Sequence, residues 1–257
     1  MEPQRLQASR GWEWIKQGYA LFVKAPLLWI VLLMICLVAA VAISAIPFIG
    51  EPLVSLLMPA MVVGLMAGCR ALHNGEELEL PHLLSGLQKH AAQLITLGGI
   101  TLIAQYLILG AMILVGGGAL VTILMSSTDV TDPNIILKAV AGAGLSVLVG
   151  IGLFSVLLMA TQFAPMIVYF NNAPPVAAMK LSFKAFTTNI MPMLVYGITF
   201  VFLAILASLP MFLGWLILLP VMFTSVYAAY IDIFPPIKDA AAAAIPNDIF
   251  SRDESHF

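Results

Sequence analysis

The sequence contains very little charge. Only 9% of its 257 residues are Asp, Glu, Lys or Arg and 61% are hydrophobic, whereas soluble domains carry roughly 25% charged residues. A soluble fold of this length could not cover its surface with so few charges. The composition therefore excludes an ordinary soluble protein and indicates a chain that lies largely in lipid.

Catalytic and cofactor-binding motifs are also lacking. The sequence has no paired carboxylates, no Ser or Cys nucleophile with a base, no nucleotide-binding glycine loop and no HExxH motif. Catalysis inside a membrane needs ionisable groups within the spans, and Asp232, at a span edge, is essentially the only one here. We therefore expect a protein that is not an enzyme and that binds no cofactor.

Cysteines and ordered metal-ligand patterns are scarce as well. Cys36 and Cys69 are too few for a disulfide framework, and we expect them to be buried thiols. One loop collects histidines and glutamates without the fixed ligand spacing of zinc sites; these are His73, Glu76, Glu77, Glu79, His82 and His90. We interpret them as solvated loop and interfacial residues and predict no metal ligand.

Long uncharged stretches are the main positive feature. Because about 20 apolar residues cross a bilayer as a helix, the gaps between charges hold six spans, the last gap being split at Pro210 and Gly214. The predicted fold is an all-α polytopic membrane protein with six transmembrane helices in three hairpins. The spans lie near 27–46, 53–72, 94–124, 136–170, 191–209 and 213–233.

Basic residues predict the orientation. With six spans, ten of the eleven lie on the side of the two termini and only Lys138 on the other; the ten are Arg5, Arg10, Lys16, Lys24, Arg70, Lys89, Lys180, Lys184, Lys238 and Arg252. Lys and Arg accumulate in cytoplasmic loops. Both termini are therefore expected in the cytoplasm.

An amphipathic segment precedes each predicted hairpin. As a helix, residues 11–24 place Trp14, Ile15 and Phe22 on one face and Glu13 and Lys16 on the other, which is typical of a helix at a membrane surface. Pro26 then ends this helix. Segments 81–94 and 174–189 show a similar separation, with Met179, Phe183 and Phe186 on the apolar face of the last.

Three similar units follow from this arrangement. Within a single membrane domain of residues 1–257, the units are 11–73, 80–171 and 174–234, followed by a short cytoplasmic tail, 235–257. Either a true internal repeat or shared apolar composition explains the likeness. The middle hairpin is the longest, so it could tilt, kink at Pro165, or project beyond the membrane with Asp132 capping its second helix; we favour a modest projection.

Several side chains are candidate functional groups. Gln105 and Gln162 could either hydrogen-bond between helices or form a mid-membrane polar site for a permeating substrate. Glu51 could bind a cation or a partner, or stabilise the first turn of a helix. Gly64 and Gly68 predict close helix packing. The three glycines at 116–118 could either form a flexible gate or simply weaken the helix there.

The lysines of the surface segments suggest a lipid partner. Lys16, Lys24, Lys89, Lys180 and Lys184 are the candidate contacts to lipid headgroups, because each basic residue near an anionic leaflet contributes about 1 kcal/mol. The expected partner is the lipid bilayer, with anionic phospholipid as the specific hypothesis. No nucleic-acid partner is expected, and no protein partner or oligomeric state follows from the sequence.

A family resemblance agrees with this architecture. The stretches GWEWIKQGYALFVKAPLLW, IPFIGEPLVSLLMPAMVVGLMAGCRAL and HLLSGLQKH resemble a family of uncharacterised proteobacterial integral inner-membrane proteins, a domain of unknown function. The layout is more distantly similar to the membrane domain beside bacterial glycerophosphodiester phosphodiesterases, whose catalytic domain does not follow here. The resemblance implies a multi-pass location in the bacterial inner membrane and no known substrate.

Two functions are compatible with these features. The one favoured by the lack of ionisable groups is a non-enzymatic scaffold, assembly or envelope-homeostasis role. The alternative is a transporter or channel for a small or lipidic substrate without buried charged coupling residues, for which broken helices at Pro59, Pro165 and Pro220 could supply a central site. A cavity reaching Gln105 and Gln162 would favour transport, and a tightly packed interior would favour the scaffold.

Overall fold

The computed structural model describes residues 2–117 and 133–235, and the described chain is helical without a β-strand. Six helices are long and apolar enough to cross a membrane, which confirms the predicted all-α polytopic fold. They are α2 (Pro26–Ser44), α3 (Gly50–His73), α5 (Ala91–Met112) continued by η2 (Ile113–Gly117), α7 (Pro133–Thr161) with α8 (Ala164–Asn171), α10 (Ile190–Ser208) and α11 (Trp215–Ile233). Shorter elements are α1 (Arg10–Lys24), η1 (Leu80–Leu84), α4 (Ser85–Gln88) and α9 (Pro175–Thr188).

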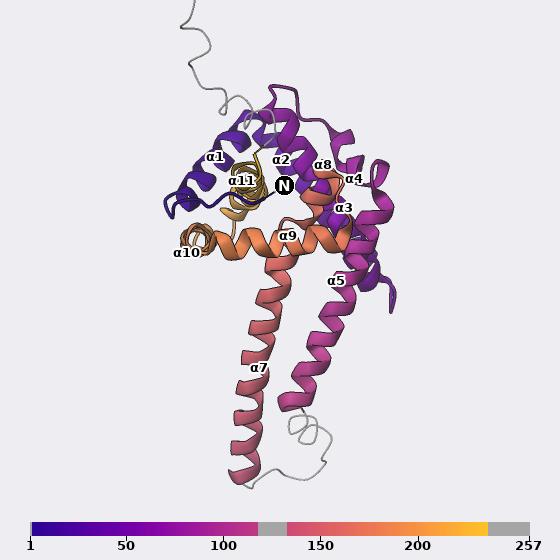
Figure 1. The fold of residues 1–257 in the computed structure, drawn as a ribbon, viewed down its shortest axis with the longest axis vertical. Helices are drawn as coiled ribbons and strands as arrows, with labels where there is room; N and C mark the ends of the chain where they lie inside the picture. Colours follow the sequence, from indigo (N-terminus) through magenta and orange to yellow (C-terminus); the bar gives the residue numbers. More distant parts are fainter. Residues whose placement is uncertain (1, 118–132, 236–257) are drawn as a thin grey trace, which may run out of the picture.

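The long helices do not all run in one direction. Figure 1 shows α5 and α7 side by side along the long axis of the molecule, reaching beyond the other helices, while α10 and α11 are seen nearly end on. Residues 118–124 of the predicted third span and the predicted cap Asp132 lie outside the described residues. The packing of α5 against α7 agrees with the predicted middle hairpin.

The surface helix α1 forms where it was predicted, but the buried part of its apolar face packs against the protein itself. Trp14 is completely buried against the rest of the protein, while Trp12 and Tyr19 are exposed. The helix packs chiefly against α11 and α10 at the far end of the chain. The interpretation of Trp14 as an anchor in lipid was therefore wrong, because this side chain fills a tertiary contact.

The second predicted surface helix is also wrong as a single element. Residues 81–94 divide into η1, α4 and the first turn of α5. The chain turns at His90, which has a left-handed backbone with φ of 63°. Hydrophobic periodicity cannot detect such a turn, because it reports which side chains share a face and not where the backbone breaks.

The third surface helix, α9, forms as predicted with a different buried face. Its buried residues are Ala178, Ser182 and Ala185, whereas Phe183 is exposed. Small side chains allow α9 to lie close against α7 and α8. Of its larger apolar residues, Val176 and Phe183 are exposed to the surroundings, while Met179 and Phe186 pack against the core.

Candidate functional site

A large cavity lies between the predicted hairpins. Its volume is about 1670 Å³, and its lining comes from α3, α5, α7, α8, α10, α11 and the turn between α2 and α3. Sites for drug-sized ligands occupy roughly 300–1,000 Å³. The cavity could therefore accept a molecule of lipid size.

The cavity extends far along α3. Its lining on this helix begins at Glu51 in the first turn and ends at Met66. At 1.5 Å per residue this stretch measures about 22 Å, and a hydrocarbon core is about 30 Å thick. The length of this site is thus comparable to most of the thickness of such a layer.

Both glutamines predicted as a mid-membrane polar site line this cavity. Gln105 projects from α5, and Gln162 lies at the end of α7. Within residues 2–117 and 133–235, neither side-chain amide has a protein hydrogen-bond partner. By contrast, the neighbouring hydroxyls of Thr101 and Thr161 donate to carbonyl oxygens of their own helices. The two amides are therefore among the polar groups in the cavity wall that remain available to a ligand.

A break in the fourth span exposes Gln162 to the cavity. The span predicted at 136–170 as one helix is instead interrupted between Thr161 and Ala164. In a continuous helix the Phe163 N–H would donate to the Met159 carbonyl. Here that N–H donates to Ser182 Oγ at 3.1 Å, and the Ser182 hydroxyl donates to the Met159 carbonyl at 2.8 Å.

The inserted serine and the following proline together explain the break. A side chain that enters the i to i−4 hydrogen-bond ladder kinks a helix, and Pro165 has no N–H to continue the ladder. The predicted kink of the middle hairpin at Pro165 is thus observed as an interruption of the helix just before this residue. Pro59 and Pro220 lie inside α3 and α11 without ending either helix.

Replacing Ser182 should destabilise this junction. Ser182→Ala removes the acceptor for one backbone N–H and the donor for one carbonyl in a fully buried position, and we expect a loss of about 1–2 kcal/mol. Thermal unfolding in detergent micelles measures it. Ser155→Ala is the control, since the Ser155 hydroxyl donates an exposed hydrogen bond to the Ile151 carbonyl of its own helix. Equal stability of both variants would contradict the role of Ser182.

Basic and aromatic side chains gather at the other end of α8 from the cavity. The Arg70 guanidinium lies 5.1 Å from the centre of the Phe170 ring, and Lys89 Nζ lies 5.5 Å from that of Tyr169. The two rings are in edge-to-face contact at 5.1 Å. We call these four residues the basic–aromatic cluster. It lies at the end of α8 opposite Pro165, which lines the cavity.

The five lysines predicted to contact lipid headgroups have different surroundings. Lys16 is ion-paired with Glu13 and Lys184 with Glu2, at 2.6 and 2.8 Å. Lys24 Nζ donates to the Leu72 carbonyl at the end of α3. Lys180 is exposed and has no ion-pair partner in the part of the chain that the structure describes. Arg70, which the sequence analysis counted only for orientation, belongs with Lys89.

The ion pair between Glu2 and Lys184 affects the pKa of Glu2. The hydrogen bond and the positive charge of Lys184 lower the pKa of the Glu2 carboxyl below its ordinary value. Because both side chains are well exposed, water screens this contact and it contributes little to stability. Its geometric effect is to hold the N-terminal segment along α9.

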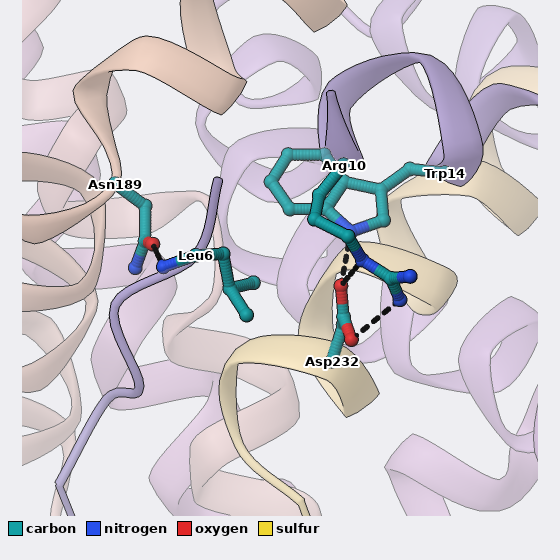
Figure 2. Close-up of polar contacts among 5 residues, drawn as sticks. All are labelled: Leu6, Arg10, Trp14, Asn189 and Asp232. Atoms are coloured by element: carbon teal, nitrogen blue, oxygen red, sulfur yellow. Dashed lines mark hydrogen bonds and ion pairs between the residues drawn. The ribbon is translucent and has the colours of Figure 1, made fainter. Parts of the chain in front are cut away.

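A partly buried polar contact, called the lock here, joins the two ends of the described chain. The Asp232 carboxylate accepts hydrogen bonds from Arg10 Nε and Nη2, both at 2.7 Å, and from Trp14 Nε1 at 2.8 Å, as Figure 2 shows. These bonds raise the pKa of Arg10 above its ordinary value. Asn189 also accepts from the Leu6 N–H and donates to the Gln4 carbonyl. The sole acid within the predicted spans thus fixes α1 on α11.

Cys69 is buried and Cys36 is half-buried, and both are reduced thiols. The prediction of buried thiols is therefore confirmed for Cys69 and only partly met for Cys36. In the acidic and histidine-rich loop, His82 Nδ1 lies 3.0 Å from the Glu79 backbone nitrogen. This contact caps the short η1 helix, so it gives His82 a local structural role.

Comparisons with known proteins agree with a membrane location. The chain is 27% identical to a Burkholderia thailandensis protein named "Probable inner membrane protein", over 96% of this chain and 98% of that protein. No protein-family model matches the chain, and no solved structure matches it. The six apolar helices and this relative together support a multi-pass inner-membrane protein.

Proposed function

We propose that this protein binds an amphipathic molecule of lipid size in its central cavity and moves it passively between the two membrane surfaces. The observation that carries the proposal is a 1670 Å³ cavity that contains both Gln105 and Gln162. This cavity favours the transport hypothesis over the scaffold that the sequence alone favoured. Passive movement is consistent with the lack of ionisable groups in mid-span, which proton or ion coupling would need.

The cavity and the basic–aromatic cluster both include residues of α3, and together they support a path between the two membrane surfaces. Glu51 and Arg70 are 19 residues apart on this helix, or about 28 Å, which is close to the hydrocarbon thickness. The short helix α8 separates the cavity from the basic–aromatic cluster. We infer that α8 shifts about the break at Phe163 when the molecule passes, because broken helices in transporters mark substrate sites.

The orientation and chemistry complete the proposal. We infer that both termini face the cytoplasm, so that Glu51 lies at the outer surface and Arg70 at the inner one, in line with the distribution of basic residues. The protein acts without a chemical step on its ligand. Its proposed partner is the bilayer, including anionic phospholipid at the basic–aromatic cluster.

Photolabelling can test whether lipid enters the cavity. The protein is reconstituted with a phosphatidylethanolamine that carries a diazirine in its acyl chain, and labelled residues are mapped by mass spectrometry. We expect labels on cavity residues of α5 and α10. Gly197→Phe should reduce them, because Gly197 lines the cavity and a Cβ atom added there would meet no protein atom within 4 Å, which leaves open space for the larger side chain.

The matched control is Gly110→Phe. A Cβ atom added at Gly110 also meets nothing within 4 Å, and this residue is not part of the cavity wall. Labelling should therefore persist in this variant. A cavity that stays unlabelled in the wild-type protein would contradict the proposed function and leave the scaffold hypothesis as the better explanation.

Anionic lipid should be retained at the basic–aromatic cluster. Replacing Arg70 and Lys89 by Gln removes two cations that have no acidic partner among the ion pairs of the described chain. We expect phosphatidylglycerol retention in native mass spectrometry to fall about thirtyfold, since each charge contributes about 1 kcal/mol. The control replaces Lys16 and Lys184, which are already ion-paired. An equal decrease in both double variants would show that only total charge matters.

A further inference from the structure

We propose that the cavity selects lipophilic cations, that is, apolar molecules with an ammonium or phosphonium centre. This inference rests on the proposed function and specifies the class of ligand. It depends on two independent properties of the cavity wall, which are its charge and its aromatic content. The sign of the charge differs from that of the basic–aromatic cluster, whose charged residues are Arg70 and Lys89.

Glu51 gives the lining of the cavity a negative charge. Among the described residues that line the cavity, it is the only charged one. Its carboxylate is exposed and is not part of any ion pair in the described chain. The N-terminus of α3 carries only about half an elementary charge of opposite sign. A net negative potential therefore remains at the mouth of the cavity, where it attracts cations and repels anions.

Aromatic rings supply the second property. Six of them line the cavity, and they come from the α2–α3 turn and from four helices: Phe48, Tyr106, Phe154, Tyr196, Phe200 and Phe223. Tyr196 and Phe200 are stacked at 5.9 Å. The face of an aromatic ring attracts a cation electrostatically and is the common recognition element for quaternary ammonium groups. An apolar cation can thus lose its water shell here without losing all favourable electrostatic contacts.

The remaining polar groups suit the same ligand. Gln105 and Gln162 present neutral amides, and an amide carbonyl can accept a hydrogen bond from an ammonium N–H or face its positive charge. No Lys or Arg of the described chain lines the cavity. A buried anion would therefore have no cation to compensate it, and burial of an unpaired charge is costly.

Two probe ions of the same shape and opposite charge test the inference. Binding of tetraphenylphosphonium and of tetraphenylborate to the purified full-length protein is measured by equilibrium dialysis in detergent. Glu51→Gln should weaken tetraphenylphosphonium binding about tenfold, equivalent to about 1.4 kcal/mol, and leave tetraphenylborate binding the same or stronger. Comparing each variant with the wild type cancels the different solubility of the two ions in detergent.

Two further variants localise the effect. Glu77→Gln makes the same charge change in an exposed loop outside the cavity and should bind both ions as the wild type does. Gly197→Phe should reduce tetraphenylphosphonium binding, because its side chain adds bulk at the cavity wall. Equal effects of Glu51→Gln on both ions would overturn the cation preference while lipid photolabelling still supported the cavity. A wild-type cavity that stays unlabelled would instead contradict the proposed function itself.

Discussion

Asp232→Ala should lower the free energy of unfolding by about 2–3 kcal/mol. The substitution leaves the Arg10 guanidinium and the indole N–H of the fully buried Trp14 without their acceptor. Breaking a fully buried ion pair costs about 3–5 kcal/mol. Because the Arg10 and Asp232 side chains are 35% and 19% exposed, we expect a smaller loss, seen as a decrease of about 5–10 °C in the thermal midpoint in detergent micelles.

A double variant separates the ion pair from the rest of the contact. Arg10→Met combined with Asp232→Leu removes both charges, so no unpaired charge remains and part of the stability should return. Glu13→Ala is the surface control, because its ion pair with Lys16 is exposed and should contribute less than about 1 kcal/mol. If Asp232→Ala unfolds at the same temperature as Glu13→Ala, the lock does not hold α1 in place.

Gly18→Ala should cost about 3 kcal/mol or more. A Cβ atom at this position would lie 2.6 Å from the Ser225 backbone nitrogen and 2.7 Å from its Cα. Because these are backbone atoms, α1 as a whole would have to move away from α11. The shift would also break the 2.8 Å hydrogen bond from the buried Thr224 hydroxyl to the Gly18 carbonyl. Thermal unfolding in the same micelles measures the effect.

Gly110→Ala provides the matched substitution for this prediction. An added Cβ there meets no atom within 4 Å, and alanine is a better helix former than glycine by roughly 1 kcal/mol. We therefore expect unchanged or slightly higher stability. If both alanine variants have the same unfolding midpoint, the close approach of α1 to α11 is not a determinant of stability.

Local sequence patterns predict the helices well but not their partners. The uncharged gaps identify the six long helices because span length and apolar character are local properties. The break at Phe163 depends on Ser182, which is 19 residues further along the chain. Pro165 indicates where a helix can be interrupted, but only the packing of α9 supplies the hydroxyl that completes the interruption.

The same distinction applies to α1. Its periodicity correctly predicts an amphipathic helix, yet a buried face can be covered by lipid or by protein. The hydrogen bond between Trp14 and Asp232 joins residues 218 positions apart, and no local pattern records that pairing. Asp232 was nevertheless recognisable as an isolated acid in an apolar span, and such residues usually have a partner.

The candidate site could be predicted in part. Gln105 and Gln162 stand out as amides within apolar runs, and the structure places them in one cavity. The six aromatic rings did not stand out, because aromatic residues are common in membrane helices of every kind. Arg70 was assigned to orientation by counting charges, whereas its position over Phe170 depends on the contact between α3 and α8.

Translocation in proteoliposomes tests the central claim most directly. Vesicles containing the protein and an acyl-labelled NBD-phosphatidylethanolamine are treated with dithionite, which bleaches only the outer leaflet, and the loss of the protected fraction measures movement between leaflets. The central claim predicts faster loss with the wild-type protein and with Gly110→Phe, and a slower rate with Gly197→Phe, whose side chain adds bulk at the cavity wall. Equal rates for Gly197→Phe and the wild type, or a wild-type rate no faster than empty vesicles, would contradict it.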